Sequence, residues 1–79
     1  MYYTYILENH DGLLYIGQTG NLKIRLAWHN SGKSKYTKNK GPWKIIFKKE
    51  FQNRGDAIKF ETYLKSLKNP HYIKTCIVK

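Results

Sequence analysis

The sequence has very little cysteine and no arrangement of residues typical of a zinc site. Cys76 is the single cysteine among 79 residues, so no intrachain disulfide can form. No set of Cys and His residues has the spacing of zinc ligands. The chain is therefore expected to be held by an apolar core rich in aromatic residues, which make up 15% of the sequence. A lone cysteine fits a reducing, cytoplasmic location.

Long hydrophobic runs are also absent. No segment approaches the ~18 apolar residues that a membrane-spanning helix needs. The apolar stretch 1–7 is short, and it lacks the basic lead and the small-residue cleavage site of a signal peptide. At this length, we expect one small domain covering residues 1–79.

Acidic residues are scarce, with five Asp and Glu against fifteen Lys and Arg and a formal net charge of +10. This surplus predicts a polyanionic partner, because contacts with phosphates release counterions and are strong at low salt. Nucleic acid is favoured over a membrane, since no segment predicts a helix with a basic face opposite a broad apolar face. Such a partner would place the protein in the cytoplasm or at the nucleoid. Charge alone leaves open a soluble basic protein without a specific partner.

The N-terminal residues predict an antiparallel β-hairpin. Residues 2–7 and 13–16 are aromatic and rich in β-formers, and the Asp11-Gly12 pair between them is a strong turn signal. Alternate residues of a strand share one face, so Tyr5 and Tyr15 are expected to emerge on the same side of the sheet.

A helix is predicted from Leu22 to His29. Asn21 is a good N-cap, and the apolar residues repeat at helical spacing. Arg25 and His29 are four residues apart and therefore point from the same helix face. The following segment, 31–41, is polar and rich in lysine and is expected to lie on the surface. The residues expected to contact nucleic acid there are Lys33, Lys35, Tyr36, Lys38 and Lys40.

A third strand is predicted from Pro42-Trp43 to Phe51. A second helix is predicted from Ala57 to Leu67, opened by the segment Asn53-Arg54-Gly55-Asp56 as a cap followed by a first-turn acid. The apolar stripe of this helix includes Leu64. Glu61 borders the stripe, a position that costs free energy unless a cation meets the carboxylate. The state of residues 71–79 stays open.

Five residues carry side chains suited to cutting a phosphodiester. They are Tyr5, Tyr15, Arg25, His29 and Glu61. Such a reaction needs a nucleophile, neutralisation of the phosphate oxygens and help for the leaving oxygen, and a bound Mg²⁺ can supply much of this. Taken one at a time, each of these residues is more often structural or solvated than catalytic.

The residue types indicate which step of phosphodiester hydrolysis each side chain could carry out. Arg25 offers a planar fork to phosphate oxygens, and His29 can relay a proton near neutral pH. Glu61 can hold Mg²⁺, which often takes one or two carboxylates and completes its shell with water and substrate oxygens. A free tyrosine has a pKa of about 10, so Tyr5 needs a nearby cation such as Arg25 to lower its pKa by ~1 to 3 units. Tyr15 is suited to donating a hydrogen bond to phosphate.

The spacing of these segments resembles the GIY-YIG nuclease superfamily over nearly the whole chain. The segments that carry the resemblance are Tyr3-Thr4-Tyr5, Tyr15-Ile16-Gly17, Leu22–His29, Lys35-Tyr36-Thr37, Pro42-Trp43 and Ala57–Leu67 with Glu61. The chain is most similar to small stand-alone members, which resemble the nuclease domain of an excision-repair enzyme. The resemblance implies an α+β fold in which a three-stranded antiparallel sheet is flanked by helices.

The resemblance also implies roles for the site residues. Tyr5 would act as or assist the general base, and Tyr15 would position the nucleophile or the phosphate. The three further roles it implies are phosphate stabilisation by Arg25, proton transfer by His29 and metal binding by Glu61.

Three positions depart from the family pattern. Tyr3-Thr4-Tyr5 stands where the family name has Gly-Ile-Tyr, and it keeps the final tyrosine. Gln18-Thr19 follows the second motif, where some branches carry a lysine. Many members have an asparagine about a dozen residues after the metal-binding glutamate, where this chain has Ile73. Asn69 is nearer, and its equivalence is open.

The sequence thus predicts an endonuclease that depends on Mg²⁺ or Mn²⁺ and hydrolyses DNA, with a preference for structure or strandedness such as single-stranded or branched DNA. DNA repair is one setting that fits, and a monomer or weak homodimer is expected. The alternative is a nucleic-acid-binding module of the same fold without turnover, and a weaker third interpretation is a partner-docking protein.

Overall fold

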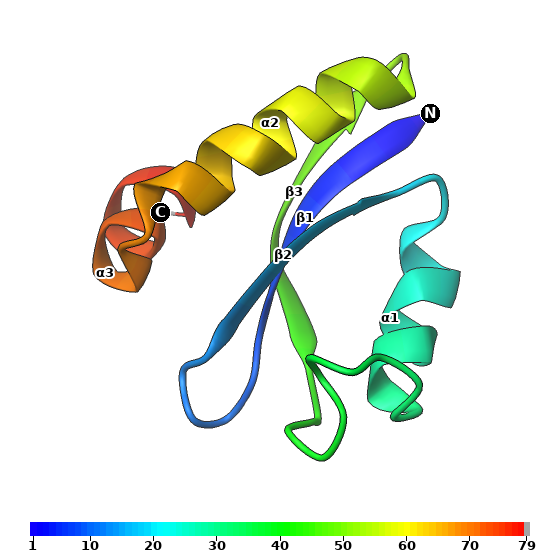
Figure 1. Ribbon diagram of the computed structural model, residues 1–79, viewed down its shortest axis with the longest axis vertical. Helices are drawn as coiled ribbons and strands as arrows, with labels where there is room; N and C mark the ends of the chain where they lie inside the picture. The colour runs from blue at the N-terminus through cyan, green and yellow to red at the C-terminus, as the bar shows by residue number, and fades with distance from the viewer. Residues whose placement is uncertain (79) are drawn as a thin grey trace.

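The structure, a computed structural model, describes residues 1–78. Three strands form one antiparallel sheet, with helices on both of its faces (Figure 1). The elements follow one another as β1 (Tyr2–Glu8), β2 (Leu14–Thr19), α1 (Leu22–Asn30), β3 (Lys44–Phe51), α2 (Arg54–Leu67), α3 (Pro70–Tyr72) and the π-helical turn η1 (Ile73–Val78). The predicted α+β fold is confirmed. In this described part of the chain, no helix has the length and apolar character to cross a membrane.

The central strand of the sheet is β1, because the strand order is β2-β1-β3. Tyr5 lies directly between Gly17 of β2 and Lys48 of β3, and both strand pairs are antiparallel. Since β1 has a neighbour on each side, its residues 4–7 are all buried. The strand that carries Tyr15 is therefore an edge strand, with one side free of strand pairing.

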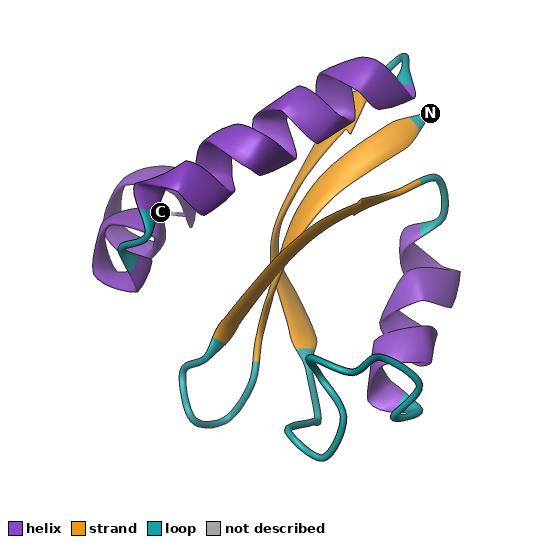
Figure 2. Cartoon of the chain, viewed as in Figure 1, coloured by secondary structure: helices purple, strands orange, loops and turns teal. Residues whose placement is uncertain are grey.

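The two faces of the sheet carry separate apolar clusters, as the alternation of side chains requires. Figure 2 shows α1 on one side of the sheet and α2 on the other. Tyr5 and Leu7 pack with Trp43 on the face covered by α1. Ile6 packs with Leu64 of α2 on the other face. The helix with Arg25 and His29 and the helix with Glu61 thus lie on opposite faces of the sheet.

The predicted hairpin and first helix are present. In the hairpin turn, the side-chain oxygen of Asn9 accepts from the backbone N–H groups of Asp11 and Leu13, and Gly12 has a φ of +81°. The side chain of Asn21 caps α1 by accepting from the N–H of Ile24 at 3.0 Å.

The second helix begins earlier than predicted, at Arg54 and not at Ala57. The side chain of Asn53 accepts from the N–H of Asp56 at 2.8 Å, which makes Asn53 the N-cap and places Asp56 in the first turn. The C-terminal segment, left open by the sequence, is helical through residue 78, and the buried Ile73 joins the cluster under α2. Residue 79 of the segment lies outside the described residues.

The segment between α1 and β3 is only partly on the surface, so the prediction for residues 31–41 is wrong at two positions. Ser34 and Thr37 are buried. The carbonyl of Thr37 accepts from the indole N–H of Trp43 at 3.1 Å, and the side chain of Asn30 bonds both the N–H and the carbonyl of Trp43. The third strand starts at Lys44, one residue after this anchored tryptophan.

Candidate active site

A chain of hydrogen bonds runs through the interior between β1 and α1. The Tyr5 hydroxyl oxygen lies 3.0 Å from Nε2 of His29, and Nδ1 of His29 lies 3.0 Å from Oγ1 of Thr37. All three side chains are buried. The strand supplies the phenol, the last turn of α1 supplies the imidazole, and the loop after α1 supplies the hydroxyl.

Tyr15 completes an aromatic group around this chain. Its ring centroid lies 4.6 Å from that of His29 and 6.4 Å from that of Tyr5. The prediction that Tyr5 and Tyr15 share one face of the sheet is confirmed. Gly17 makes room for both, since a Cβ at that position would stand 2.6 Å from the Tyr5 hydroxyl and 3.1 Å from a ring carbon of Tyr15. The glycine of the Tyr15-Ile16-Gly17 segment is thus required by close packing.

Burial decides the protonation of the histidine. It lowers the pKa of His29, and the positive charge of Arg25 lowers it further. The ring is therefore neutral at neutral pH, with one N–H donor and one acceptor nitrogen. The phenol is the more acidic of the two hydroxyl partners. We therefore assign the Tyr5 O–H as donor to Nε2 and the Nδ1–H as donor to Thr37 Oγ1.

Burial also raises the pKa of the Tyr5 phenol above its ordinary value, and the nearby Tyr15 and Glu61 act in the same direction. Arg25 lowers the pKa of Tyr5, as the sequence predicted, but its effect is smaller than that of burial. The prediction that Arg25 lowers the pKa of Tyr5 below its ordinary value is therefore wrong for the protein without a ligand. The phenol is neutral and needs a proton acceptor, and the structure places His29 against it.

Arg25 is the cation that acts electrostatically on this group within the described residues. It affects the pKa of both Tyr5 and His29, and its guanidinium carbon lies 4.9 Å from the ring centroid of Trp28. Among residues 1–78 no carboxylate forms an ion pair with Arg25. A guanidinium that stacks on an aromatic ring without a carboxylate partner keeps its donors available to an anion.

Glu61 lies on α2, on the far side of β2 from His29. Its Oε2 is 2.8 Å from Nζ of Lys65, so the expected cation does meet this carboxylate, and the Glu61 side chain is 18% exposed. The Glu61 charge contributes to raising the pKa of Tyr5, although it is the smallest of the causes. Because β2 is an edge strand, side chains from both faces of the sheet can line one pocket beside it.

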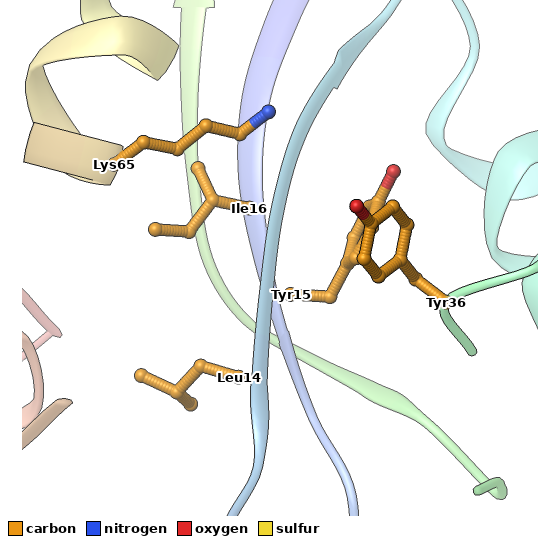
Figure 3. A pocket seen from close by; sticks show the side chains of 5 residues that line it. All are labelled: Leu14, Tyr15, Ile16, Tyr36 and Lys65. Carbon is orange, nitrogen blue, oxygen red and sulfur yellow. The ribbon is translucent and has the colours of Figure 1, made fainter. Parts of the chain in front are cut away.

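An open pocket of about 390 Å³ spans this edge (Figure 3). Tyr15 and Tyr36 line it on the α1 side of β2, and Ile16 and Lys65 line it on the α2 side, with Leu14 below. The pocket therefore contacts Tyr15 of the aromatic group on one side of β2 and Lys65 of the Glu61–Lys65 ion pair on the other.

The donor set fits a metal that keeps most of its water. Within residues 1–78 no three His, Cys, Asp or Glu side chains form a cluster, so a closed protein cage is absent there. A single carboxylate, Glu61, suits Mg²⁺ or Mn²⁺ bound together with phosphate oxygens of a substrate. The side-chain oxygen of Gln18, on the same edge strand, is buried and has no hydrogen-bond partner among the described residues.

The other predicted site residues lie outside this group. The side-chain oxygen of Asn69 accepts from the N–H of Tyr72 at 3.1 Å and caps α3, so it is already engaged. Ile73 belongs to the apolar cluster under α2. The residues predicted to contact nucleic acid, which are Lys33, Lys35, Tyr36, Lys38 and Lys40, lie along the loop after α1, and Tyr36 is the most exposed aromatic residue of the described chain.

Comparison with known proteins decides the family. The family described as the GIY-YIG catalytic domain matches residues 1–74. The chain belongs to the GIY-YIG family. The family is a nuclease superfamily whose members generally depend on a divalent metal and act on DNA.

Relatives of this GIY-YIG protein are small proteins named UPF0213. The UPF0213 protein YsiG of Lactococcus lactis is 48% identical over 65 residues, which are 81% of this chain and 62% of that protein. A UPF0213 protein of Staphylococcus haemolyticus is 34% identical over 74 residues, which are 92% of this chain and 90% of that protein. This chain thus spans less than two thirds of the Lactococcus relative and most of the Staphylococcus one.

A solved structure has the same fold. The solution NMR structure of a UPF0213 protein from Bacillus halodurans aligns with a TM-score of 0.51 and 37% sequence identity. The alignment covers 84% of this chain and 72% of that chain. The GIY-YIG fold predicted from the sequence is therefore shown both by sequence relatives and by a structural neighbour.

Thr37 is a site residue to which the sequence assigned no role. It stands in the segment Lys35-Tyr36-Thr37, which contributed to the GIY-YIG resemblance only by its spacing. A threonine in a polar, lysine-rich loop is expected to be exposed on the surface. Its hydroxyl reaches Nδ1 of His29 because Trp43 and Ser34, both buried, hold this loop against the sheet.

Replacing Thr37 with valine should disturb His29 without changing the size of the buried side chain. The buried Nδ1–H would lose its acceptor, which should lower the free energy of unfolding by about 1 to 3 kcal/mol. The ¹⁵N chemical shifts of the His29 ring should change from one dominant tautomer to a mixture. Thr37→Ser keeps the hydroxyl and should restore both properties.

The matched control is Thr4→Val. Thr4 is also buried, but its hydroxyl donates to the carbonyl of Ala57 on the opposite face of the sheet. This variant should lose stability while the ¹⁵N shifts of His29 stay as in the wild type. Unchanged ring shifts in Thr37→Val would show that Thr37 does not orient the histidine.

Proposed function

We propose that this protein is a divalent-metal-dependent endonuclease that hydrolyses phosphodiester bonds of DNA. The observation that carries the proposal is the meeting of two groups at the edge strand β2. Tyr5, Tyr15 and His29 lie on one side, and Glu61 lies on the other, and the pocket at this edge is lined by Tyr15 and by Lys65, the ion-pair partner of Glu61. Arg25 adds a positive charge that no described carboxylate neutralises by an ion pair.

The hydrogen bond between Tyr5 and His29 suggests how the attacking water loses its proton. The phenol oxygen accepts a proton from water while the phenol passes its own proton to Nε2 of His29. The histidine becomes an imidazolium whose Nδ1–H remains bonded to Thr37. This relay avoids a free phenolate, which the raised pKa of Tyr5 makes scarce.

The remaining side chains would act on the phosphate. Arg25 neutralises charge on the phosphate oxygens as the new P–O bond forms, and Tyr15 donates a hydrogen bond to one of them. Glu61 would hold the divalent ion, which supplies a Lewis acid for the phosphate and for the leaving oxygen when it is bound. For that, Glu61 must exchange its ion pair with Lys65 for the metal, and Lys65 is then free to meet a phosphate.

A second candidate function keeps the same surface without turnover. The Glu61 carboxylate is already paired with Lys65, and an exposed Tyr36 lies among lysines that can follow a phosphate backbone. A nucleic-acid-binding module would use these features and need no metal. Metal dependence therefore separates the two functions.

Incubation of the purified protein with single-stranded, duplex and branched DNA tests the proposal. We expect cleavage with Mg²⁺ or Mn²⁺ and none in EDTA, with the single-stranded or branched substrate cut fastest. One active site cuts one strand at a time, so a duplex should be nicked before it is broken. Tight, salt-sensitive binding without products under any metal condition would instead select the binding module.

A further inference from the structure

We infer that the pocket at the edge of β2 holds one nucleobase of the bound strand, stacked on Tyr36. The inference rests on the proposed function, since it takes DNA as the substrate. It goes further by assigning a base, and not only phosphates, to a defined place beside the site.

Tyr36 is held in a conformation that presents its ring to solvent. It is 76% exposed, although the residue that follows it, Thr37, is 1% exposed. The loop is fixed on both sides of the ring, by the N–H of Lys38 donating to the carbonyl of Ser34 at 2.9 Å and by the contacts of Thr37 with His29 and Trp43. An aromatic ring held in this way binds with little loss of conformational entropy.

The ring also has a specific position relative to the site. Its centroid lies 6.4 Å from that of Tyr15, which itself contacts His29. In Figure 3 the rings of Tyr15 and Tyr36 enter the pocket from opposite sides and overlap in the view. Tyr15 thus supports Tyr36 from within, and the outer face of the Tyr36 ring is left to a ligand.

The chemistry of the pocket fits a nucleotide. Two phenol rings and two aliphatic side chains provide an apolar surface for a flat base, and Lys65 on the far side of β2 provides a cation for phosphate. Stacking on an aromatic side chain tolerates any base, because every base has a π face. The pocket therefore adds affinity for an unpaired base without reading sequence.

The experiment compares two short single strands of equal length in EDTA, so that no cleavage occurs. One is an oligonucleotide of mixed sequence, and the other is an abasic oligomer with the same phosphates. Fluorescence anisotropy should show the wild type binding the abasic oligomer about 10-fold more weakly, the usual size of one stacking contact. Tyr36→Ala should bind both strands with the same weak affinity, and Tyr36→Trp should keep the difference.

Two control variants refine the result. Tyr72 is 41% exposed on α3 and does not line the pocket, so Tyr72→Ala should keep the wild-type difference. Lys65→Gln should weaken binding of both strands by the same factor, because both carry the phosphates. The inference is overturned if the wild type does not distinguish the two strands, or if Tyr36→Ala keeps at least half of the wild-type difference. These outcomes are independent of cleavage. The nuclease proposal is tested separately, by the metal dependence of DNA cleavage.

Discussion

Glu61→Gln should reduce metal-dependent DNA cleavage by about 1,000-fold or more, which corresponds to the loss of several kcal/mol of transition-state stabilisation from a correctly held metal. The substitution keeps the shape of the side chain and removes the charge that would bind the ion. Among the described residues, Glu61 is also the one carboxylate whose charge raises the pKa of Tyr5. Initial rates across a series of Mn²⁺ concentrations would measure the effect, and high Mn²⁺ should restore little activity.

Glu8→Gln is the matched control. Glu8 also forms an ion pair with a lysine, Lys74, and its side chain is 21% exposed, close to the 18% of Glu61. Both substitutions thus remove one partly buried ion pair. Only the change at Glu61 should affect cleavage, whereas both should have similar, small effects on the free energy of unfolding. If Glu61→Gln cuts DNA at the wild-type rate, Glu61 is not a metal ligand.

Tyr5→Phe should slow cleavage by about 100-fold to 10,000-fold, the usual range for a residue that transfers a proton in the transition state. The variant loses the hydrogen bond to Nε2 of His29 and with it the route by which the water proton reaches the histidine. The buried Nε2 is left without its donor, so the free energy of unfolding should fall by about 1 to 3 kcal/mol. Chemical denaturation would check that the variant remains folded under assay conditions.

Tyr3→Phe removes a phenol from the same strand and is the comparison for Tyr5→Phe. The Tyr3 hydroxyl donates to Glu50 at 3.2 Å in an exposed position away from His29. Its loss should leave the cleavage rate unchanged. Equal rates for the two variants would remove Tyr5 from the reaction.

The pH profile gives an independent test of the relay through Tyr5. Burial lowers the pKa of His29 below its ordinary value of 6.5, and only the neutral ring can accept the proton. The neutral fraction grows with pH, so the wild-type rate should rise through this lowered pKa and then level off above it. In Tyr5→Phe this acid limb should disappear. A wild-type rate that still rises tenfold per pH unit far above 6.5 would point to a metal-bound hydroxide instead.

Much of the local structure could be predicted because its causes lie within a few residues. The Asp11-Gly12 turn, the Asn21 cap and the alternation that puts Tyr5 and Tyr15 on one face all depend on neighbours along the chain. The helix spacing likewise identified Arg25 and His29 as partners on one face. The cap of α2 at Asn53 and its first-turn acid Asp56 were predicted as well, and only the first helical residue was placed too late, at Ala57 and not at Arg54, because the apolar stripe begins at Ala57.

The electrostatic character of the site could not be predicted in the same way. Tyr5 was expected to have its pKa lowered by Arg25, but burial has the larger effect and raises it. Burial depends on how both helices cover the sheet, which local spacing does not report. For the same reason Thr37 looked like a surface residue, although it contacts His29 inside the protein.

The amino-acid sequence by itself determined the α+β class, the GIY-YIG resemblance and the set of residues suited to phosphodiester chemistry, because strand and helix periods and caps are local properties. Only the tertiary structure decided that Thr37 supports His29, that Tyr36 faces solvent beside Tyr15, and that Lys65, the ion-pair partner of Glu61, lines the same pocket as Tyr15. These contacts join residues from different elements, and the position of one element against another is set by packing of the two apolar clusters.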